Sequence, residues 1–190
     1  KRNKSNELLK VLSDSGSGTW EGVIAGIEHS VKIINDNGLD KNKCVLNLSL
    51  GGAYNAALDA AVKKAADQGI RFAIAAGNSG ADADGFSPAA AGDHPNVFTV
   101  SAADNQYIMA NFSNWDDPNG GDDVDLAAPG VSVLSWKGNG RDKGSLVRWN
   151  GTNGSKCGIY YNLKNTGTQY KNNNRKTITF LNKGRSVDGL

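Results

Sequence analysis

Cysteine and long apolar runs are scarce in this chain of 190 residues, and each scarcity excludes a class of protein. Two cysteines, Cys44 and Cys157, fit neither a disulfide framework nor a metal site with paired ligands. No apolar run approaches the length that spans a bilayer, and no apolar signal segment follows the charged residues of KRNKSNE. A composition of 38% hydrophobic and 21% charged residues predicts one soluble globular domain that has no membrane partner.

A large charge excess is also missing, because the net charge is +2, but the balance changes near residue 150. Residues 1–150 carry 14 Lys and Arg against 18 Asp and Glu, hence 14 − 18 = −4, whereas residues 151–190 carry 7 against 1, hence 7 − 1 = +6. The same tail contains no alanine and many asparagines. Its basic residues are accompanied by no aromatic platform or helical basic stripe, so we expect no nucleic-acid partner.

The spacing of apolar residues predicts strands that alternate with helices. From Trp20 to Ile34 they recur at steps of three and four, which predicts an amphipathic helix, and residues 55–67 predict an alanine-rich second helix. Strands are predicted at 8–12, 44–50, 70–76, 96–102 and within 124–135. Because such strands need crossover connections, the pattern predicts an α/β fold with a mostly parallel sheet.

Three glycine-rich loops, SDSGSG, SLGG and GNSG, follow predicted strands. Ligands of open α/β sheets bind at the carboxyl ends of the strands, so these loops mark a candidate cleft. A phosphate loop is one alternative for Gly16–Gly18, but Glu21 and Gly22 break the G-x-G-x-x-G spacing and no G-K-[ST] follows. Nucleotide binding is therefore a third alternative, and each loop taken alone is equally well explained as a tight turn.

Six segments occur in the order and approximate spacing of one known family. They are VLSDSGSGTWEGVIAGIEHSV, NLSLGG, AIAAGNSGADADGFSPAA, VFTVSAADN, ANFSNW and VDLAAPGVSVLS. With these motifs, residues 8–152 resemble the catalytic domain of the subtilisin-like serine proteases, the subtilases, and their proteinase K side more than most. The resemblance implies a three-layer α/β/α fold, truncated here, and the hydrolysis of peptide bonds.

The resemblance also implies where a peptide substrate would lie. In this family the segments that match Ser15–Gly18 and Ser49–Gly51 are extended strands, and the substrate pairs with them through its main chain. Trp20 would wall a pocket for a substrate side chain, or would pack on the core instead. The small residues at 75–77 would leave room for a large apolar side chain next to the cut. The implied substrate-binding residues are Gly16, Ser17, Gly18, Trp20, Ser49, Leu50, Gly51, Ala75, Ala76 and Gly77.

Asn78 follows the apolar run RFAIAAG, at the exit of a predicted strand. An asparagine at a strand end is ordinarily a turn residue. In the subtilases the matching amide donates to the oxygen that becomes negative when a peptide carbonyl is attacked, a charge that is absent from the ground state. The resemblance therefore implies that Asn78 is the oxyanion donor.

The catalytic triad is not evident in this sequence. The family takes its Asp and His from motifs upstream of the strand that matches 8–12, and we expect this chain to begin after both. We expect neither His29, on the polar side of its helix, nor His94, in a loop, to act as the base. Where the family has the serine of G-T-S-M-A, this chain has Asn153.

Residues after 152 offer two weak nucleophile candidates. Ser155 lies two residues after the position of the family's serine, and a serine in a surface loop is its simplest interpretation. Cys157 has no nearby base that would form its thiolate. Codons that encode Asn-Gly-Ser can also encode Met-Ala-Ala when they are read one base later. We therefore interpret residues 153–190 as a divergent, basic, Asn-rich tail that is out of frame or poorly ordered, and residues 8–152 as a partial subtilase domain.

We expect this chain to carry the groove of a serine endopeptidase while being inactive itself, and the alternative is a non-catalytic, peptide-binding pseudoprotease. The substrate would be a polypeptide, and the protein a secreted, extracellular monomer. No cofactor is required. The acidic stretch 116–125 contains oxygen ligands that suit a structural calcium ion, although its spacing is not that of an EF-hand and a solvated turn explains it more simply.

Overall fold

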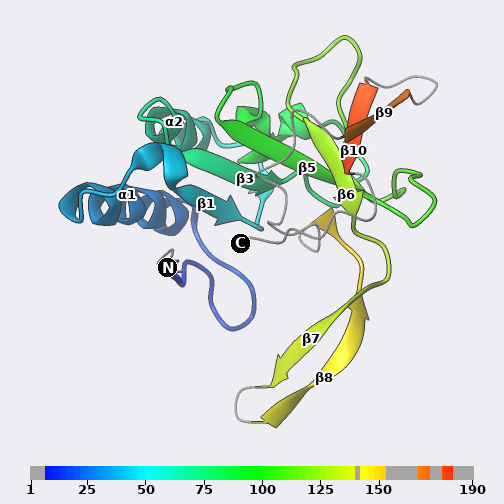
Figure 1. Cartoon of the computed structure of the whole chain (residues 1–190), viewed down its shortest axis with the longest axis horizontal. Helices are drawn as coiled ribbons and strands as arrows, with labels where there is room; N and C mark the ends of the chain where they lie inside the picture. The colour runs from blue at the N-terminus through cyan, green and yellow to red at the C-terminus, as the bar shows by residue number, and fades with distance from the viewer. Residues whose placement is uncertain (1–6, 140–141, 153–166, 172–176, 182–190) are drawn as a thin grey trace.

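The computed structural model describes residues 7–139, 142–152, 167–171 and 177–181. Helices α1 (Trp20–Asp36) and α2 (Ala56–Ala66) alternate along the chain with strands (Figure 1). The strands are β1 (Val45–Leu48), β2 (Gly52–Ala53), β3 (Arg71–Ala75), β4 (Phe86–Ser87), β5 (Val97–Ala103), β6 (Leu126–Pro129), β7 (Val133–Asn139), β8 (Asp142–Trp149), β9 (Gly167–Lys171) and β10 (Thr177–Leu181).

The main sheet of the described residues has the strand order β1-β3-β5-β6-β10-β9. The pairs β1–β3, β3–β5, β5–β6 and β6–β10 are parallel, and only β10–β9 is antiparallel. Strands β2 and β4 form a short antiparallel pair at the side. The predicted α/β class with a mostly parallel sheet is therefore confirmed.

Each helix begins where the sequence supplies a side chain that accepts a backbone hydrogen bond. The Thr19 hydroxyl accepts from the Gly22 N–H at 3.1 Å before α1, and the Asn55 side-chain Oδ1 atom accepts from the Leu58 N–H at 2.9 Å before α2. These caps satisfy donors that have no partner inside the helix. Beyond the end of α2 at Ala66, Gly69 has a φ of +94°, which a residue with a Cβ rarely adopts, so the helix cannot continue through residue 69.

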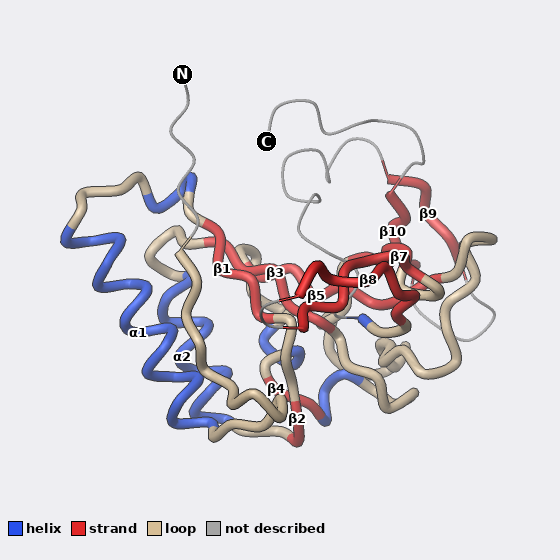
Figure 2. The backbone as a smooth tube through the Cα atoms, turned by 90° about the horizontal axis from the view of Figure 1, so that it is seen from below, coloured by secondary structure: helices blue, strands red, loops and turns tan. Residues whose placement is uncertain are grey.

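Both helices cover the same face of the sheet (Figure 2). Val23, Ile27 and Ile34 of α1 and Leu58 and Val62 of α2 form one buried cluster with strand side chains. Those strand residues are Leu48, Phe72, Ile74 and Val97. They share a face because Leu48 pairs with Ile74 and Phe72 with Val97. Full burial of a side chain such as Phe72 contributes about 1.5–3 kcal/mol to folding.

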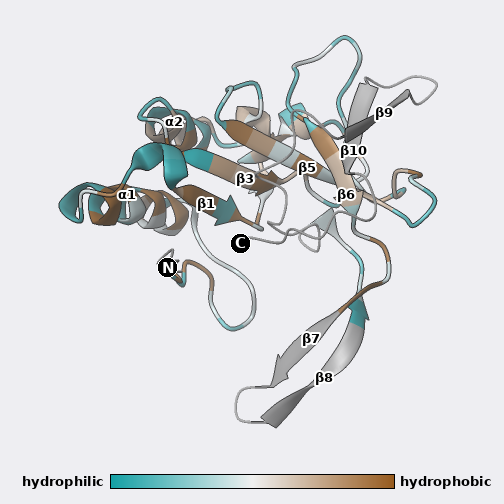
Figure 3. Ribbon diagram, viewed as in Figure 1, coloured by the Kyte–Doolittle hydropathy of each residue, from teal (hydrophilic) through white to brown (hydrophobic). Residues whose placement is uncertain are grey.

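The opposite face of the central strands carries smaller residues, among them Ala73 and Ala75. In the described residues, this face is not covered by an α-helix (Figure 2). Apolar residues still dominate the central strands (Figure 3), as expected for strands within a parallel sheet.

Two of the predicted strands differ in the structure. Residues 8–12, predicted as a strand, form none, and Val11 instead packs on the core beside α1. The predicted strand within 124–135 is divided at Gly130 into β6 and β7, and β7 pairs with β8 as a hairpin that projects from the body (Figure 1). No helix among the described residues has the length and apolarity of a membrane span.

Candidate functional site

Asn78 lies just beyond the carboxyl end of β3, and its side chain is held by Thr152. The Asn78 Oδ1 atom accepts hydrogen bonds from the Thr152 N–H at 2.9 Å and from the Thr152 hydroxyl at 3.1 Å. Because a backbone N–H can only donate, the atom that faces Thr152 must be the amide oxygen, and the amide nitrogen points away from it. Thr152 is 2% exposed whereas Asn78 is exposed, so a buried residue orients a surface amide.

The Thr152 hydroxyl connects the backbone and the side chain of this site. It accepts from the Gly77 N–H at 3.2 Å while it donates to Asn78. Gly77 has a φ of +110°, a conformation that favours glycine. Thr152 is anchored in turn by the preceding residue, since the Gly151 N–H donates to the Gly130 carbonyl, at the end of β6, at 2.9 Å.

One of the two predicted groove segments, Ser49–Gly51, and the predicted pocket residues Ala75–Gly77 lie at the same edge of the sheet. Because β1 and β3 are parallel and Leu48 pairs with Ile74, Ser49–Gly51 and Ala75–Gly77 both follow the carboxyl ends of neighbouring strands. Ser49 and Leu50 are half-buried and Gly51 is exposed. Ala75 and Ala76 are buried and Gly77 is half-buried, and the Ala76 N–H continues the sheet by donating to the Val100 carbonyl at 3.0 Å.

Residues 13–18 form a turn, whereas the resemblance implied an extended strand at Ser15–Gly18. The Ser13 N–H donates to the Ser17 carbonyl at 2.8 Å, and the Gly16 N–H donates to the Ser13 carbonyl at 3.0 Å. Gly16 has a φ of +81°, and Gly16, Ser17 and Gly18 are all exposed. The serine-rich sequence closes the loop on itself, because Ser13 also accepts from the Ser17 N–H with its hydroxyl.

Trp20 lies between the start of α1 and the segment that follows Gly51. Its indole packs on Gly52 so closely that a Cβ at residue 52 would lie 2.8 Å from two ring carbons. Trp20 also contacts the main core cluster. The packing alternative predicted for Trp20 is therefore present, and the contact joins the start of α1 to the exit of β1.

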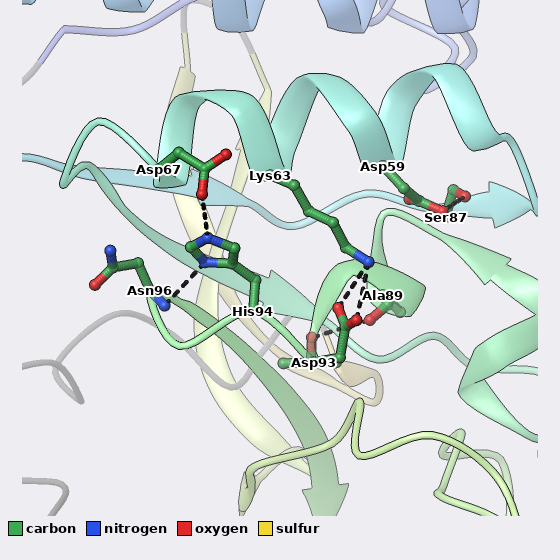
Figure 4. A network of polar contacts seen from close by, with 9 residues as sticks. Asp59, Lys63, Asp67, Ser87, Ala89, Asp93, His94 and Asn96 are labelled. Carbon is green, nitrogen blue, oxygen red and sulfur yellow. Dashed lines mark hydrogen bonds and ion pairs between the residues drawn. The ribbon is translucent and has the colours of Figure 1, made fainter.

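The two histidines lie away from this edge. His29 is exposed on α1. The His94 Nδ1 atom accepts from the Asn96 N–H at 3.1 Å and its Nε2 atom bonds the Asp67 carboxylate at 3.0 Å (Figure 4). His94 precedes β5 and Asn78 follows β3, so in a parallel sheet they occupy opposite edges. His94 therefore ties α2 to β5 and is too distant to serve a reaction at Asn78.

The weak nucleophile candidate Ser155 lies outside the described residues, as do Asn153 and Cys157. The described chain reaches Thr152, the residue that bonds Asn78. Asn153 therefore directly follows, in the sequence, the residue that orients the candidate oxyanion donor.

The acidic stretch 116–125 uses its carboxylates within the fold. Asp116 Oδ1 accepts from the N–H groups of Asp123 and Val124 at 3.2 and 2.9 Å, and Asp125 Oδ2 accepts from the Thr99 N–H at 2.8 Å. Among the described residues, no group of three or more His, Cys, Asp or Glu side chains is placed to hold a metal ion. The carboxylates alone therefore do not assemble a calcium site.

Two of these carboxyl groups are hard to ionise. Burial, reinforced by the charges of Asp116 and Asp122, raises the pKa of Asp125 to about 7. Burial also raises the pKa of Asp123 to about 8, together with a hydrogen bond to the Asp84 carboxyl group and its charge. These two groups hold protons in the folded chain at pH values where an exposed aspartate has lost its own.

Asn114 is a site residue that received no role from the sequence, although it lies in the quoted motif ANFSNW. Its side chain is 0% exposed, and its amide bonds the loop that carries Asn78. Thr152 was missed for a similar reason. Neither residue has a spacing signal of its own, because both reach Asn78 only through tertiary contacts.

Comparison with known proteins gives one consistent family. Residues 5–177 match the model of the subtilase family, a range that extends beyond residues 8–152 at both ends. The chain is 46% identical over 131 residues to subtilisin-like protease 2 of Pseudogymnoascus destructans, an alignment that covers 68% of this chain and 30% of that protein. It is 44% identical over 131 residues to the subtilisin-like serine protease AsES of Sarocladium strictum, with 68% and 31% covered.

A solved structure agrees with these relatives. The crystal structure of a cold adapted subtilisin-like serine proteinase superposes with a TM-score of 0.61 and 36% sequence identity. The superposition covers 76% of this chain and 46% of that one. The chain thus spans about a third of the length of the two curated relatives and less than half of the solved structure.

Proposed function

The chain belongs to the subtilase family, and from this membership we propose that its described residues form the oxyanion and substrate side of a serine endopeptidase site. The observation that carries the proposal is the Thr152 contact, which fixes Asn78 at the carboxyl edge of the sheet. That edge is where ligands of α/β sheets bind. The parent reaction would be hydrolysis of a peptide bond, with a polypeptide as the substrate.

In this proposal Asn78 acts on the charge that develops during the reaction. Attack on a peptide carbonyl turns its oxygen into an oxyanion, and a preorganised N–H donor stabilises that charge without having to reorient. Thr152 supplies the preorganisation, because it holds the amide oxygen and leaves the nitrogen on the opposite side. Removal of such a donor from subtilisin, the family's type example and the source of this magnitude, lowers kcat by about 10²–10³.

We propose further that the chain of 190 residues is not itself a peptidase. Asn153 occupies the position of the family's nucleophilic serine, and an amide side chain cannot be activated as an alkoxide. His94 is committed to Asp67 and Asn96 at the other edge of the sheet. Such a chain would bind peptides without cleaving them, as a pseudoprotease module does.

The remaining expectations are proposals of the same kind. The chemistry needs no cofactor, and we propose an extracellular monomer without a nucleic-acid partner. A structural calcium ion at 116–125 would need backbone or amide oxygens in addition to the carboxylates. Added CaCl2 should then raise the denaturation midpoint relative to the same protein in a chelator, and an equal midpoint in both would reject that ion.

Two measurements on the purified chain test the proposal. A biotinylated fluorophosphonate should not label it above a heat-denatured sample, with subtilisin as the positive control. Covalent labelling of Ser155 or of any other serine would refute the predicted inactivity.

The second measurement tests the oxyanion donor without catalysis. The ¹⁵N-labelled chain is titrated with acetyl-Ala-Ala-Phe that carries either a free carboxylate or a terminal amide. The carboxylate resembles the cleaved product and places a negative oxygen where the oxyanion would form. The side-chain NH₂ signal of Asn78, identified by its loss in Asn78→Asp, should shift with the carboxylate peptide more than with the amide peptide. Equal responses would reject Asn78 as the donor.

A further inference from the structure

We propose that Asn114 is a positioning residue for the oxyanion donor, an inference that rests on the proposed function of Asn78. Asn114 lies between β5 and β6, far from residue 78 in the sequence, and its side chain is 0% exposed. A buried primary amide must find hydrogen-bond partners, because burying a polar group without them destabilises the fold. Its partners here are all in the loop that presents Asn78.

The Asn114 amide bonds this loop on both sides of Asn78. Its Nδ2 atom donates to the Ala76 carbonyl at 2.9 Å, and its Oδ1 atom accepts from the Ser79 N–H at 2.8 Å. A longer contact of 3.4 Å joins Oδ1 to the Ala81 N–H. One side chain therefore spans residues 77 and 78 as a bridge and fixes where the chain enters and leaves them.

The backbone of Asn114 adds a further connection. Its N–H donates to the Gly77 carbonyl at 2.9 Å, so the peptide unit between Gly77 and Asn78 is held directly. The backbone carbonyl of Asn114 accepts from the Ser113 hydroxyl, which also accepts from the Ala102 N–H of β5 at 2.8 Å. Asn114 is thus anchored to the sheet, and its hydrogen bonds hold the loop in place relative to the sheet.

Gly77 is shaped to admit this amide. A Cβ built at residue 77 would overlap the Asn114 side-chain nitrogen. The φ of +110° at Gly77 also disfavours any residue with a Cβ. Because Gly77 has no side chain, the buried Asn114 amide can occupy the space beside it, directly before Asn78 in the sequence.

Asn114 and Thr152 divide the task of presenting Asn78. Asn114 fixes the backbone through Ala76, Gly77 and Ser79, and Thr152 fixes the side chain through Oδ1. The backbone sets the direction of the Cα–Cβ bond, so the Thr152 contact can orient the amide only if the loop is already in place.

The substitution Asn114→Asp isolates this role. It conserves size and keeps an acceptor for the Ser79 N–H, but it places an oxygen opposite the Ala76 carbonyl, where two acceptors repel. Asn114→Ser is the second variant, because it is uncharged and removes the bridge entirely. Asn114→Ser is used for the same measurement if Asn114→Asp does not fold.

A matched control exists at the opposite edge of the sheet. The Asn96 Nδ2 atom donates to the Ala66 carbonyl at 3.0 Å, so Asn96→Asp also places an oxygen opposite a backbone carbonyl. It should also lower the free energy of unfolding, by less than Asn114→Asp because Asn96 is half-buried, and it should leave Asn78 unaffected. A general loss of stability can therefore be separated from a positioning effect.

The test titrates each full-length variant with acetyl-Ala-Ala-Phe, as carboxylate and as amide, and follows the Asn78 side-chain NH₂ signal. In the Asn114 variants we expect the affinity for the carboxylate peptide to fall by about tenfold, the equivalent of one hydrogen bond. The Asn96→Asp variant should retain the wild-type affinity. Equal losses in the Asn96 and Asn114 variants, or no loss in either, would overturn the positioning role. A wild-type chain that does not distinguish the two peptides would instead reject the proposed function.

Discussion

Replacement of Thr152 by valine removes a single hydroxyl from the centre of the candidate site. That hydroxyl accepts from the Gly77 N–H at 3.2 Å and donates to Asn78 Oδ1 at 3.1 Å, while the Thr152 N–H makes a further bond to the same Oδ1 atom. Valine and threonine have nearly the same shape, so Thr152→Val creates no cavity in the 2% exposed position.

The expected cost follows from what each partner loses. The Gly77 N–H is half-buried and loses the Thr152 hydroxyl as its acceptor, which costs about 1–3 kcal/mol when nothing replaces it. The Asn78 oxygen is exposed and keeps the bond from the Thr152 N–H, so water can replace the lost donor at little cost. We therefore expect Thr152→Val to lower the free energy of unfolding by about 1–2 kcal/mol.

Thr152→Ser is the matched control, because it keeps the hydroxyl and deletes only the methyl group. It also costs about 1 kcal/mol through lost apolar burial, so a denaturation midpoint alone does not separate the two variants. Hydrogen exchange at the Gly77 N–H does separate them. Exchange should accelerate by about tenfold in Thr152→Val beyond any change in global opening, and it should not accelerate in Thr152→Ser. Equal Gly77 protection in both variants would refute the assigned hydrogen bond.

Four further outcomes are expected. Leu58→Ala, at a fully buried position on α2, should lower the free energy of unfolding by about 2–5 kcal/mol in urea titrations, and a loss below about 1 kcal/mol would contradict the helix packing. Burial raises the pKa of Asp125 from 3.8 to about 7, so the folded chain binds the extra proton between these values. The stability that this bound proton contributes is complete below pH 3.8 and is lost as the pH rises through 7. In calcium-free buffer the free energy of unfolding should therefore fall from pH 5 to pH 8. Asp125→Asn should make the free energy of unfolding depend less on pH over this range. Gly52→Val should displace the Trp20 indole and change the tryptophan emission spectrum, and an unchanged spectrum would contradict their contact. Asn153→Ser should leave fluorophosphonate labelling at background, because a nucleophile without a base is not activated, and labelling would show that a base is present.

The sequence predicted the elements that follow from local periodicity. The apolar spacing from Trp20 to Ile34 predicts α1, which spans Trp20–Asp36, and the alanine-rich run 55–67 predicts α2. Long apolar runs likewise predict the central strands, because a strand inside a parallel sheet is buried on both sides. The prediction failed at residues 8–12, where a short apolar run has the composition of a strand but finds no neighbouring strand in the described fold and packs beside α1.

The sequence predicted the candidate site only at residues whose role follows from a family motif. Asn78 stands in AAGN and could be assigned by resemblance, and the parallel sheet then brought Ser49–Gly51 to the same edge. Asn114 and Thr152 could not be assigned, because their roles depend on contacts between segments that are distant in the sequence. At Ser13–Ser17 the structure has the tight turn that was one interpretation of this loop, and not the extended strand that the resemblance implied, because the Ser13 hydroxyl accepts from a backbone N–H that a strand would present outward.

The described contacts that present Asn78 come from Thr152 and Asn114. Thr152 uses its own backbone N–H and hydroxyl, and Asn114 uses its amide and its backbone. None of these contacts uses residue 153, so the proposed donor role of Asn78 and the proposed loss of the nucleophile are independent parts of the proposal. In the proposed function, binding of a product-like negative charge and the making of a covalent bond therefore depend on different residues. A chain that keeps the first and lacks the second is consistent with every contact described around Asn78.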